Sequence, residues 1–272
     1  MIFSVERPFL LVGAGKMGGA MLSGWMADGV DPAAIVVCDP GPGPEMVALL
    51  SKHAIRHVTA APEDVNPGLV LVAVKPQMMD VVLPSLAAIV SSDTVILSVA
   101  AGTPISRFAS EFGDVPIARA MPNTPSMVGR GITGVFPNAA VTDAQKDTID
   151  ELLSAVGKVV WLDREEQIDQ VTAVSGSGPA YVFWLAECLA EAGRELGLPE
   201  AIARELADAT VSGAGELMHQ SSDTTSTLRK NVTSPNGTTA AALEVLMAPD
   251  GVQPVMTKAV AAAARRAREL AG

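Results

Sequence analysis

The sequence predicts an α/β fold in which a doubly wound, mostly parallel sheet is followed by a second, all-helical domain. Short β-rich runs alternate with helical stretches over roughly the first 165 residues, which is the pattern of repeated βαβ units. Several of these runs are apolar throughout, as strands are when helices cover both faces of their sheet. Beyond Asp163 almost no β-rich run follows until residue 220. We therefore expect one domain over residues 1–164 and a second over residues 165–272.

The expected strands share β-branched or other apolar residues. They are Phe9–Val12, Ile35–Val37, Leu69–Val74, Thr94–Val99, Pro116–Ala120, Thr133–Phe136 and Val159–Leu162. In the second domain, the apolar residues of Val182–Leu196 recur on one face of a helix. The segment Gly197-Leu198-Pro199 breaks this helix, and Pro199 lies near the first turn of the next one. A Thr/Ser-rich loop and two further helical stretches from Thr239 onward complete the expected order.

The composition argues against several classes of protein. A hydrophobic fraction of 49% against 18% charged residues indicates a folded core rather than disorder. The formal net charge of −11 disfavours nucleic-acid binding, which needs a basic surface. No apolar run reaches the ~18–20 residues of a membrane span, and the first ten residues lack the core of a signal peptide. Cys38 and Cys188 have no metal-ligand spacing, so we expect small buried thiols, no metal site and a cytoplasmic protein.

A glycine-rich segment, Gly13-Ala14-Gly15-Lys16-Met17-Gly18, directly follows the first expected strand and opens a helical stretch. In a G-x-G-x-x-G motif the first glycine makes a tight turn, and the second lets a pyrophosphate approach the backbone. The third allows the helix to pack closely on the strand. The helix start offers its N–H groups to the phosphates. Alone, the motif also fits an ordinary glycine-rich turn, but its place in the first βαβ unit favours a Rossmann-type dinucleotide site.

Asp39 ends the second expected strand, about 20 residues after the glycine motif, where dinucleotide-binding folds place an acidic residue. A carboxylate there accepts hydrogen bonds from an unmodified ribose and repels a 2′-phosphate. No Lys or Arg lies between Lys16 and Lys52 to offset that repulsion. Asp39 also fits a simple cap of the Asp-Pro-Gly turn. We expect NADH or NADPH as the cofactor, with NADH favoured.

Three further loops follow expected strands at their carboxyl ends, namely Ala73–Gln77, Ser98–Gly102 and Met121–Pro125. Open α/β sheets bind ligands at this edge. Each loop alone is compatible with an ordinary strand-to-helix turn, whereas the three together favour a site. In the helical domain, the small residues of Ser175–Tyr181 fit close helix packing and a substrate pocket about equally.

The loop Asn231–Thr239 precedes another helical stretch. Gly237 permits a positive φ, and the amides of Gly237, Thr238 and Thr239 are then unpaired at a helix start with hydroxyls beside them. A substrate carboxylate fits such a site. From the residues alone, an ordinary Ser/Thr cap is slightly favoured over an anion site.

Taken together, these motifs resemble those of the pyrroline-5-carboxylate reductase family. They are G-x-G-x-M-G, A-V-K-P-Q, A-A-G, R-x-M-P-N-T-P, S-G-S-G-P-A-Y and L-R-x-x-V-T-S-P-x-G-T-T, in the family's order over nearly the whole chain. The resemblance implies an NAD(P)H-dependent oxidoreductase of proline biosynthesis that reduces the cyclic imine 1-pyrroline-5-carboxylate to L-proline. It also implies a homodimer or higher homo-oligomer formed through the helical domain, with each active site completed by a neighbouring subunit.

The resemblance assigns residues to both ligands. To the cofactor it assigns Gly13, Ala14, Gly15, Lys16, Met17, Gly18, Asp39, Val74, Lys75 and Ala101, with Asn231 approaching from the helical domain. To the substrate it assigns Glu165, Ser234, Gly237, Thr238 and Thr239. Thr238 and the Gly237 amide would hold the carboxylate, and the hydroxyl of Thr239, the catalytic residue, would bond the imine nitrogen.

Two residues depart from the family's pattern. Asn236 replaces a glycine that the family usually has, but Asn tolerates a left-handed backbone. Asp39 stands where NADPH-preferring members often have a neutral or basic residue, which puts the usual NADPH preference in doubt.

Two other functions stay open from the sequence. A β-hydroxyacid dehydrogenase-type reductase has a similar two-domain build but typically relies on a lysine in its helical domain. Lys230 and Lys258 are the candidates there, and neither lies in a matching motif. A dinucleotide-sensing regulator would not need the Ser234–Thr239 loop.

Because a protonated cyclic imine is already electrophilic, we expect Thr239 to orient its nitrogen rather than to act as a strong acid.

Overall fold

The computed structural model describes residues 2–271 and divides into two compact units. One comprises Met1–Gly176 with Ala264–Gly272, and the other Ser177–Ala263. In this division residues 165–176 belong to the first unit, and the domain boundary between residues 164 and 165 stays a prediction. Within residues 2–271 no helix is long and apolar enough to cross a membrane. Over the same residues, no three His, Cys, Asp or Glu side chains are grouped to hold a metal ion.

The first unit is built on an eight-stranded sheet of order β3-β2-β1-β4-β5-β6-β7-β8. Neighbouring strands are parallel except β6 and β7, which are antiparallel. The chain builds outward from β1 in both directions, so the order reverses between β1 and β4. The strands are β1 (Phe9–Val12), β2 (Ile35–Cys38), β3 (Arg56–Val58), β4 (Leu69–Val72), β5 (Val95–Ser98), β6 (Ile117–Met121), β7 (Gly131–Pro137) and β8 (Gly157–Trp161). The predicted Rossmann-type, mostly parallel sheet is confirmed.

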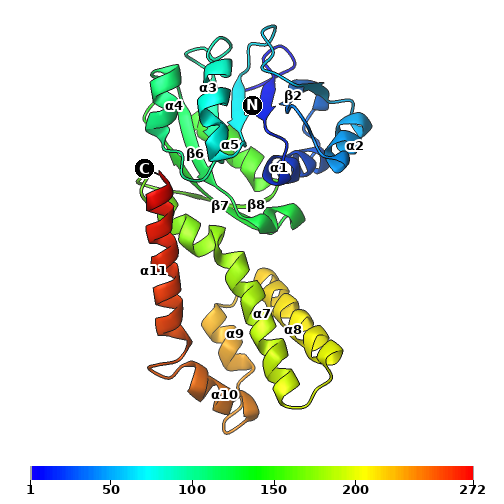
Figure 1. The fold of residues 1–272 in the computed structure, drawn as a ribbon, viewed down its shortest axis with the longest axis vertical. Helices are drawn as coiled ribbons and strands as arrows, with labels where there is room; N and C mark the ends of the chain where they lie inside the picture. The colour runs from blue at the N-terminus through cyan, green and yellow to red at the C-terminus, as the bar shows by residue number, and fades with distance from the viewer. Residues whose placement is uncertain (1, 272) are drawn as a thin grey trace. The chain divides into compact units, whose positions relative to one another are not determined.

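Helices cover both faces of this sheet, as its apolar strands require (Figure 1). Leu11 and Val37 share one core with residues of α1, α2 and α5, whereas Leu10 and Val36 share the other with residues of α3 and α4. These helices are α1 (Lys16–Ala27), α2 (Pro44–Lys52), α3 (Met79–Leu86), α4 (Ile105–Phe112) and α5 (Asp143–Ser154). Short 3-10 turns are η1 (Pro32–Ala34), η2 (Pro76–Met78) and η3 (Thr124–Val128). Because β1 to β6 are parallel to one another, their carboxyl ends meet at one edge of the sheet.

The strand β3 was not predicted. It has three residues, and its Arg56 and His57 are exposed, so it lacks the apolar run that marks the other strands. Its pairing with β2 places it beside the end of that strand. Two predicted strands, Leu69–Val74 and Thr94–Val99, are longer than the observed β4 and β5 because their last residues turn into the loops at the carboxyl edge.

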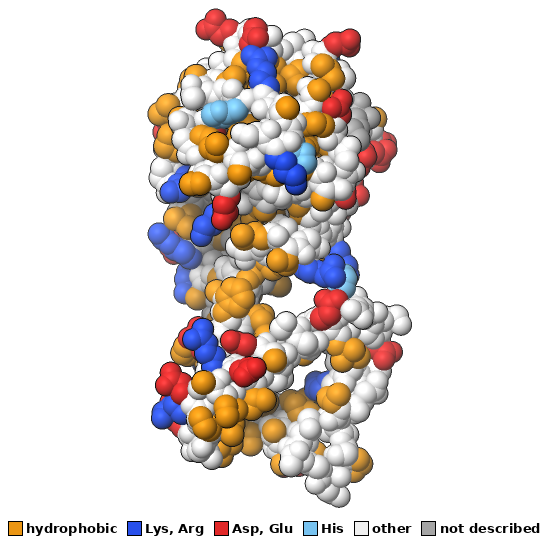
Figure 2. All heavy atoms as spheres, turned by 90° about the vertical axis from the view of Figure 1, so that its right-hand side faces the viewer, with side chains coloured by type: hydrophobic (Ala, Val, Ile, Leu, Met, Phe, Trp, Pro, Cys, Tyr) orange, Lys and Arg blue, Asp and Glu red, His pale blue; other side chains and the backbone are white. Residues whose placement is uncertain are grey.

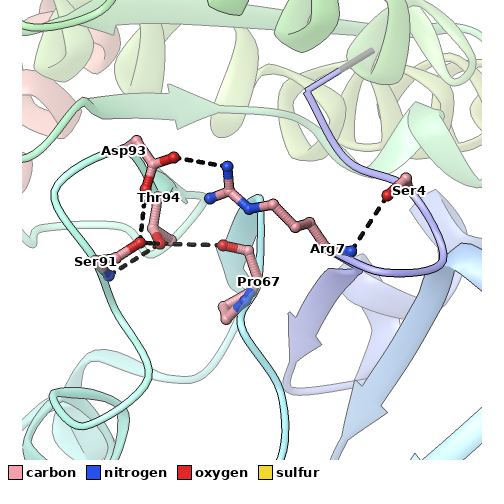
Figure 3. A network of polar contacts seen from close by, with 6 residues as sticks. All are labelled: Ser4, Arg7, Pro67, Ser91, Asp93 and Thr94. Atoms are coloured by element: carbon pink, nitrogen blue, oxygen red, sulfur yellow. Dashed lines mark hydrogen bonds and ion pairs between the residues drawn. The ribbon is translucent and has the colours of Figure 1, made fainter.

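A polar network fastens the opposite, amino-terminal edge of the sheet (Figure 3). Arg7 Nη1 donates to Asp93 Oδ2 at 2.6 Å, and Thr94 Oγ1 donates to the Pro67 carbonyl at 3.0 Å. Ser91 Oγ also donates to Asp93, at 2.7 Å. The bonds from Ser91 and Arg7 lower the pKa of Asp93, which keeps its carboxylate charged. These residues precede β1, β4 and β5, so the network stabilises the sheet away from the edge where ligands are expected.

Among its described residues, the second unit has helices as its only regular elements, joined by short loops. It contains α7 (Gly178–Glu195), α8 (Glu200–Gln220), α9 (Thr225–Asn231), α10 (Thr238–Leu246) and part of α11 (Val252–Ala271). The predicted break at Gly197, where φ is +96°, joins α7 to α8, which lie side by side (Figure 1). The helix α9 lies in the stretch predicted as a loop, because Thr224 caps it by accepting a hydrogen bond from the Thr227 amide.

Much of α7 is exposed in the single chain. None of its 18 residues is buried, and apolar side chains are visible on the helical unit in Figure 2. Cys188 lies exposed on α7, so its predicted burial is wrong for the single chain, because α8 covers only part of this helix. Cys38 is buried at the end of β2, as predicted. Burial, together with the Asp39 charge, raises the pKa of the Cys38 thiol and makes it a poor nucleophile.

Candidate functional site

The glycine-rich loop joins β1 to α1, and each of its glycines meets a different constraint. Gly13 has a φ of +91°, and a Cβ there would lie 2.8 Å from Val74 Cγ1. A Cβ on Gly18 would collide with the Gly13 carbonyl oxygen. A Cβ on Gly15 would have no atom within 4 Å, so this exposed residue faces open space. The loop thus offers the bare backbone that a pyrophosphate needs.

The first turn of α1 leaves donors beside that space. Gly15 is the N-cap of this 12-residue helix, and no side chain caps it. The amides of Lys16 and Met17 therefore point out of the N-terminus, where the helix dipole adds partial positive charge. Lys16 is exposed at the same turn. Together, the loop and this turn fit the phosphates of a dinucleotide.

Asp39 follows β2 and holds the glycine-rich loop by a hydrogen bond. Its Oδ2 accepts a hydrogen bond from the Ala14 amide at 2.7 Å, and its Oδ1 accepts one from the Gly41 amide at 2.8 Å. The bond to Gly41 confirms that Asp39 caps the Asp-Pro-Gly turn. Each carboxylate oxygen has a further lone pair with which to accept a bond from a ribose hydroxyl. The ribose contact itself stays a prediction.

Val74, Lys75 and Ala101 lie in the loops that follow β4 and β5. These strands are the next two in the sheet beyond β1, and Val74 reaches Gly13 as described above. Lys75 and Ala101 are exposed, while Val74 is half-buried. The predicted cofactor residues of the first unit therefore lie together at the carboxyl edge of the sheet.

A buried ion pair that was not predicted lies at the same edge. Arg119, on β6, is 6% exposed, and its Nη1 lies 3.1 Å from Glu165 Oε1. The same Oε1 accepts a hydrogen bond from the Ile105 amide in the first turn of α4, at 2.8 Å. Arg119 Nη2 also lies 4.0 Å from Asp169 Oδ1. Glu165, predicted to face the substrate, thus connects β6 with α4, and its contact with a substrate stays a prediction.

Asn123 fixes the third loop to the chain that follows α6 (Gln167–Val171). Its side-chain amide donates to the carbonyl of Ser175, in the π-helical segment η4 (Thr172–Gly176), at 3.1 Å. Its side-chain oxygen accepts from the Ile132 amide at 2.9 Å. A Cβ on Gly176 would lie 2.8 Å from Met121 Cε. Close packing at Gly176 agrees with the first of the two interpretations of Ser175–Tyr181, but a Cβ on Gly178 would meet no atom within 4 Å, and a role in the substrate pocket stays a prediction.

The missed residues Arg119 and Asn123 did leave a signal in the sequence. Arg119 is a polar side chain within the otherwise apolar strand Ile117–Met121, and Asn123 lies two residues after it. A buried polar group needs a partner, but the partners, Glu165 and Ser175, lie 46 and 52 residues further along the chain. The sequence pattern indicates such a requirement without identifying the residue that meets it.

In the helical unit, the turn Ser234–Thr239 forms the start of α10. The positive φ belongs to Asn236, at +58°, whereas Gly237 has a φ of −83°. The expected positive φ at Gly237 is therefore wrong. Glycine is needed there for space, since a Cβ would collide with Ser234 Oγ. The expected tolerance of Asn236 for a left-handed backbone is confirmed.

The start of α10 offers two of the three amides expected there. The Gly237 amide donates to the Ser234 carbonyl at 3.1 Å, so the expectation that it is unpaired is wrong. Gly237 is the N-cap of this nine-residue helix, and no side chain caps it, so the alternative of an ordinary Ser/Thr cap is not formed. The amides of Thr238 and Thr239 point out of the N-terminus beside their own hydroxyls. Asn231 is exposed at the end of α9.

Two family models match the chain. Residues 165–270 match the model described as pyrroline-5-carboxylate reductase dimerisation. Residues 9–102 match the model described as coenzyme F420-dependent NADP oxidoreductase. The first match covers the motifs of the helical unit, and the second covers the glycine-rich loop and the strands beside it.

Relatives match over nearly the full length. The pyrroline-5-carboxylate reductase of Pseudomonas aeruginosa is 40% identical over 96% of this chain and 95% of its own. The solved pyrroline-5-carboxylate reductase of Coxiella burnetii is 34% identical, with a TM-score of 0.90 over 98% of this chain and 99% of that one. The Plasmodium falciparum pyrroline carboxylate reductase with NADP bound is 25% identical, with a TM-score of 0.79 over 98% of each chain. The chain therefore belongs to the pyrroline-5-carboxylate reductase family.

Proposed function

We propose that this chain reduces 1-pyrroline-5-carboxylate to L-proline, the last step of proline biosynthesis, with a nicotinamide dinucleotide. The observation that carries the proposal is the similarity to reductases of that name over nearly the full length of both chains. Two local features support it. The first unit has a bare glycine-rich loop suited to a dinucleotide, and the second has an uncapped helix start suited to a carboxylate.

The cofactor residues proposed in the first unit would each contact a different part of the dinucleotide. The backbone of Gly13–Gly18 would hold the pyrophosphate, and Asp39 would accept hydrogen bonds from the adenosine ribose. The loops that contain Val74, Lys75 and Ala101 would line the remainder, and Asn231 of the helical unit is also assigned to the cofactor. When bound, the reduced dinucleotide supplies the hydride that the reaction requires.

The substrate is proposed to bind with its carboxylate at the start of α10. The amides of Thr238 and Thr239 would donate to its oxygens, and Ser234 and Gly237 would shape the turn around them. Glu165 would face the substrate through Oε2, since its Oε1 already accepts two hydrogen bonds.

The reaction needs orientation more than acid catalysis. The imine nitrogen is protonated before the transfer, so the carbon accepts a hydride and the nitrogen keeps its proton as the C=N π pair becomes a lone pair. Thr239 would hold this nitrogen by a hydrogen bond and so orient the carbon. No proton has to be delivered during the transfer, which agrees with the lack of His and Cys in the matched motifs.

The proposal includes a preference for NADH over NADPH. A 2′-phosphate would approach the Asp39 carboxylate, whose charge repels it. The hydrogen bonds from Ala14 and Gly41 hold that carboxylate at the end of β2, which restricts its rotation into solvent. The relative from Plasmodium falciparum was solved with NADP bound, so the preference has to be measured for this chain.

Proline-dependent reduction of NAD⁺ and NADP⁺ at high pH tests the proposal, because the reverse reaction uses a stable substrate. We expect turnover with L-proline that is lost in Gly15→Val, whose side chain would fill the open space over the loop. Turnover only with β-hydroxy acids would favour the β-hydroxyacid dehydrogenase alternative. Dinucleotide binding with no turnover on any of these compounds would favour a regulator.

A further inference from the structure

The strand β3 brings His57 to the corner where the cofactor ribose is proposed to bind. In the parallel pair of β2 and β3, His57 lies opposite Val37, and the Asp39 amide donates to the Val58 carbonyl at 3.0 Å. His57 Nε2 lies 2.8 Å from the Asp39 carbonyl oxygen, and the residue is exposed. Asp39 is thus linked to the glycine-rich loop through its carboxylate and to His57 through its carbonyl.

This contact determines where the imidazole carries its proton. A carbonyl oxygen only accepts hydrogen bonds, so the Asp39 carbonyl requires the proton on Nε2. In the neutral ring Nδ1 then has no proton and can only accept. When the ring is protonated, Nδ1 becomes a donor, the ring gains a positive charge, and the bond to Asp39 is retained. Only the protonated ring therefore attracts a phosphate.

Apart from Lys16 in the first turn of α1, which lines the same hollow as Glu45, the charged groups on the adjoining elements do not supply a cation to this corner. On β3, Arg56 Nη2 donates to both carboxylate oxygens of Asp64, at 2.8 and 2.9 Å, and strand alternation directs Arg56 and His57 to opposite faces. On α2, Glu45 lies in the first turn and Lys52 in the last, at the far end of the helix. Beside the ends of β2 and β3, the fixed charges of Asp39 and Glu45 are both negative.

We infer that His57 is a specificity-determining residue, which admits the 2′-phosphate of NADPH when it is protonated and leaves NADH favoured when it is neutral. The inference rests on the proposed dinucleotide site. A protonated His57 offsets the charge of Asp39 at the point where a 2′-phosphate differs from a hydroxyl. The charge state of this ring, which the contact with the Asp39 carbonyl holds at the ribose corner, therefore sets which of the two dinucleotides is favoured.

Two variants of His57 imitate the neutral and the protonated state of its ring. His57→Gln is neutral at every pH and keeps an N–H donor for the Asp39 carbonyl, whereas His57→Lys is charged throughout. The probes are 2′,5′-ADP and 5′-AMP, which carry the ribose with and without its 2′-phosphate, and calorimetry gives their dissociation constants at pH 6 and pH 8. The measured quantity is the dissociation constant of 5′-AMP divided by that of 2′,5′-ADP, which rises as 2′,5′-ADP is preferred. His53→Gln is the matched control.

For the unmodified protein we expect preference for 2′,5′-ADP to rise about tenfold from pH 8 to pH 6, as one gained charge contact allows. The ratio should approach that of His57→Lys at pH 6 and that of His57→Gln at pH 8. The 2′-phosphate itself takes up a proton near pH 6, as phosphate monoesters do. That effect is also present in His57→Gln, so the difference between the two proteins isolates the imidazole.

Equal ratios for His57→Lys and His57→Gln at both pH values would overturn the inference, as would a pH dependence that survives unchanged in His57→Gln. Failure of both nucleotides to bind would overturn it together with the dinucleotide site. The binding measurement involves no proline chemistry. If the ratios behave as expected while proline-dependent turnover is missing, the proposed reaction fails and the role of His57 stands.

Discussion

At the scale of single residues, Asp39 combines a structural and a selective role in one carboxylate. It accepts hydrogen bonds from Ala14 in the glycine-rich loop and from Gly41 in its own turn. A serine has one side-chain oxygen in place of the two carboxylate oxygens, so it would replace one of these acceptor contacts at best. Substitution should therefore loosen the loop for every dinucleotide, in addition to removing the charge that acts on the 2′-phosphate.

Asp39→Ser is expected to lower affinity for both cofactors but to shift selectivity towards NADPH. A carboxylate within ~4 Å of a 2′-phosphate, at an effective dielectric of ~20, costs on the order of a few kcal/mol. The NADPH-to-NADH ratio of kcat/KM should rise about tenfold or more at pH 8. Asp31→Ser is the control, because Asp31 caps η1 by accepting from Ala33. A native enzyme that already prefers NADPH at pH 8 would show that Asp39 serves the turn alone.

At the scale of elements, the Arg119–Glu165 pair anchors the chain after β8 to the sheet. Arg119→Met would leave the carboxylates of Glu165 and Asp169 without their buried cation. We expect unfolding to become easier by about 3–5 kcal/mol, as when one partner of a buried pair is removed. Adding Glu165→Gln should recover part of this loss, because it removes one uncompensated charge. Denaturant unfolding measures both effects.

An exposed ion pair gives the matched control for this experiment. Lys146 lies 3.4 Å from Asp143 Oδ1, with side chains 40% and 99% exposed. Lys146→Met should change stability by less than about 1 kcal/mol. A loss in Arg119→Met as small as this one would mean that the buried pair contributes nothing beyond a surface contact.

The start of α10 makes a different prediction, since it concerns substrate binding alone. Gly237→Val would force a side chain against Ser234 Oγ and displace the turn that presents the Thr238 and Thr239 amides. The KM for 1-pyrroline-5-carboxylate should rise at least about tenfold, as loss of a charge-assisted hydrogen bond implies. The dissociation constant for the dinucleotide should remain nearly unchanged.

Thr238→Val distinguishes the contribution of this residue's amide to substrate binding from that of its hydroxyl. The variant keeps the backbone N–H and the branched shape, so a site built on amides should retain most of its affinity for the carboxylate. The KM for 1-pyrroline-5-carboxylate, measured by steady-state kinetics in Gly237→Val and Thr238→Val, would show whether the amides or the hydroxyl bind the carboxylate. An equal rise in cofactor dissociation constant and substrate KM in Gly237→Val would count against a carboxylate site at α10.

The elements differ in how far the sequence predicts them, for physical reasons. Buried parallel strands such as β1 and β4 are apolar throughout and were recognised by that pattern. The strand β3 is short and exposed, and α9 begins in a Thr-rich segment that also suits a loop. In the predicted site, the need for glycine at residue 237 was identified, but the reason is steric space rather than φ. Contacts such as Arg119–Glu165 depend on tertiary packing, which a local pattern does not contain.

At the scale of the whole molecule, the helical unit has more apolar surface than a single chain covers. Phe183 and Trp184 on α7 are 64% and 63% exposed, and no residue of α7 or α10 is buried. Large apolar side chains at this exposure on successive helices are typical of an interface. The family model matched by residues 165–270 is described as a dimerisation domain, which supports the same conclusion.

We expect a homodimer or higher homo-oligomer whose active sites draw on two subunits, and subunit mixing tests both parts. Gly15→Val disables the proposed cofactor loop and Gly237→Val the proposed substrate turn, so each homo-oligomer should be inactive. If a site takes the loop from one subunit and the turn from its partner, a mixed dimer contains one intact site. Unfolding and refolding an equimolar mixture should then recover about a quarter of the wild-type activity, since half of the dimers are mixed and each has one working site. Sedimentation of the wild-type protein should show no monomer at micromolar concentration. An active monomer would contradict the oligomer, and a stable oligomer without complementation would place both parts of each site in one chain.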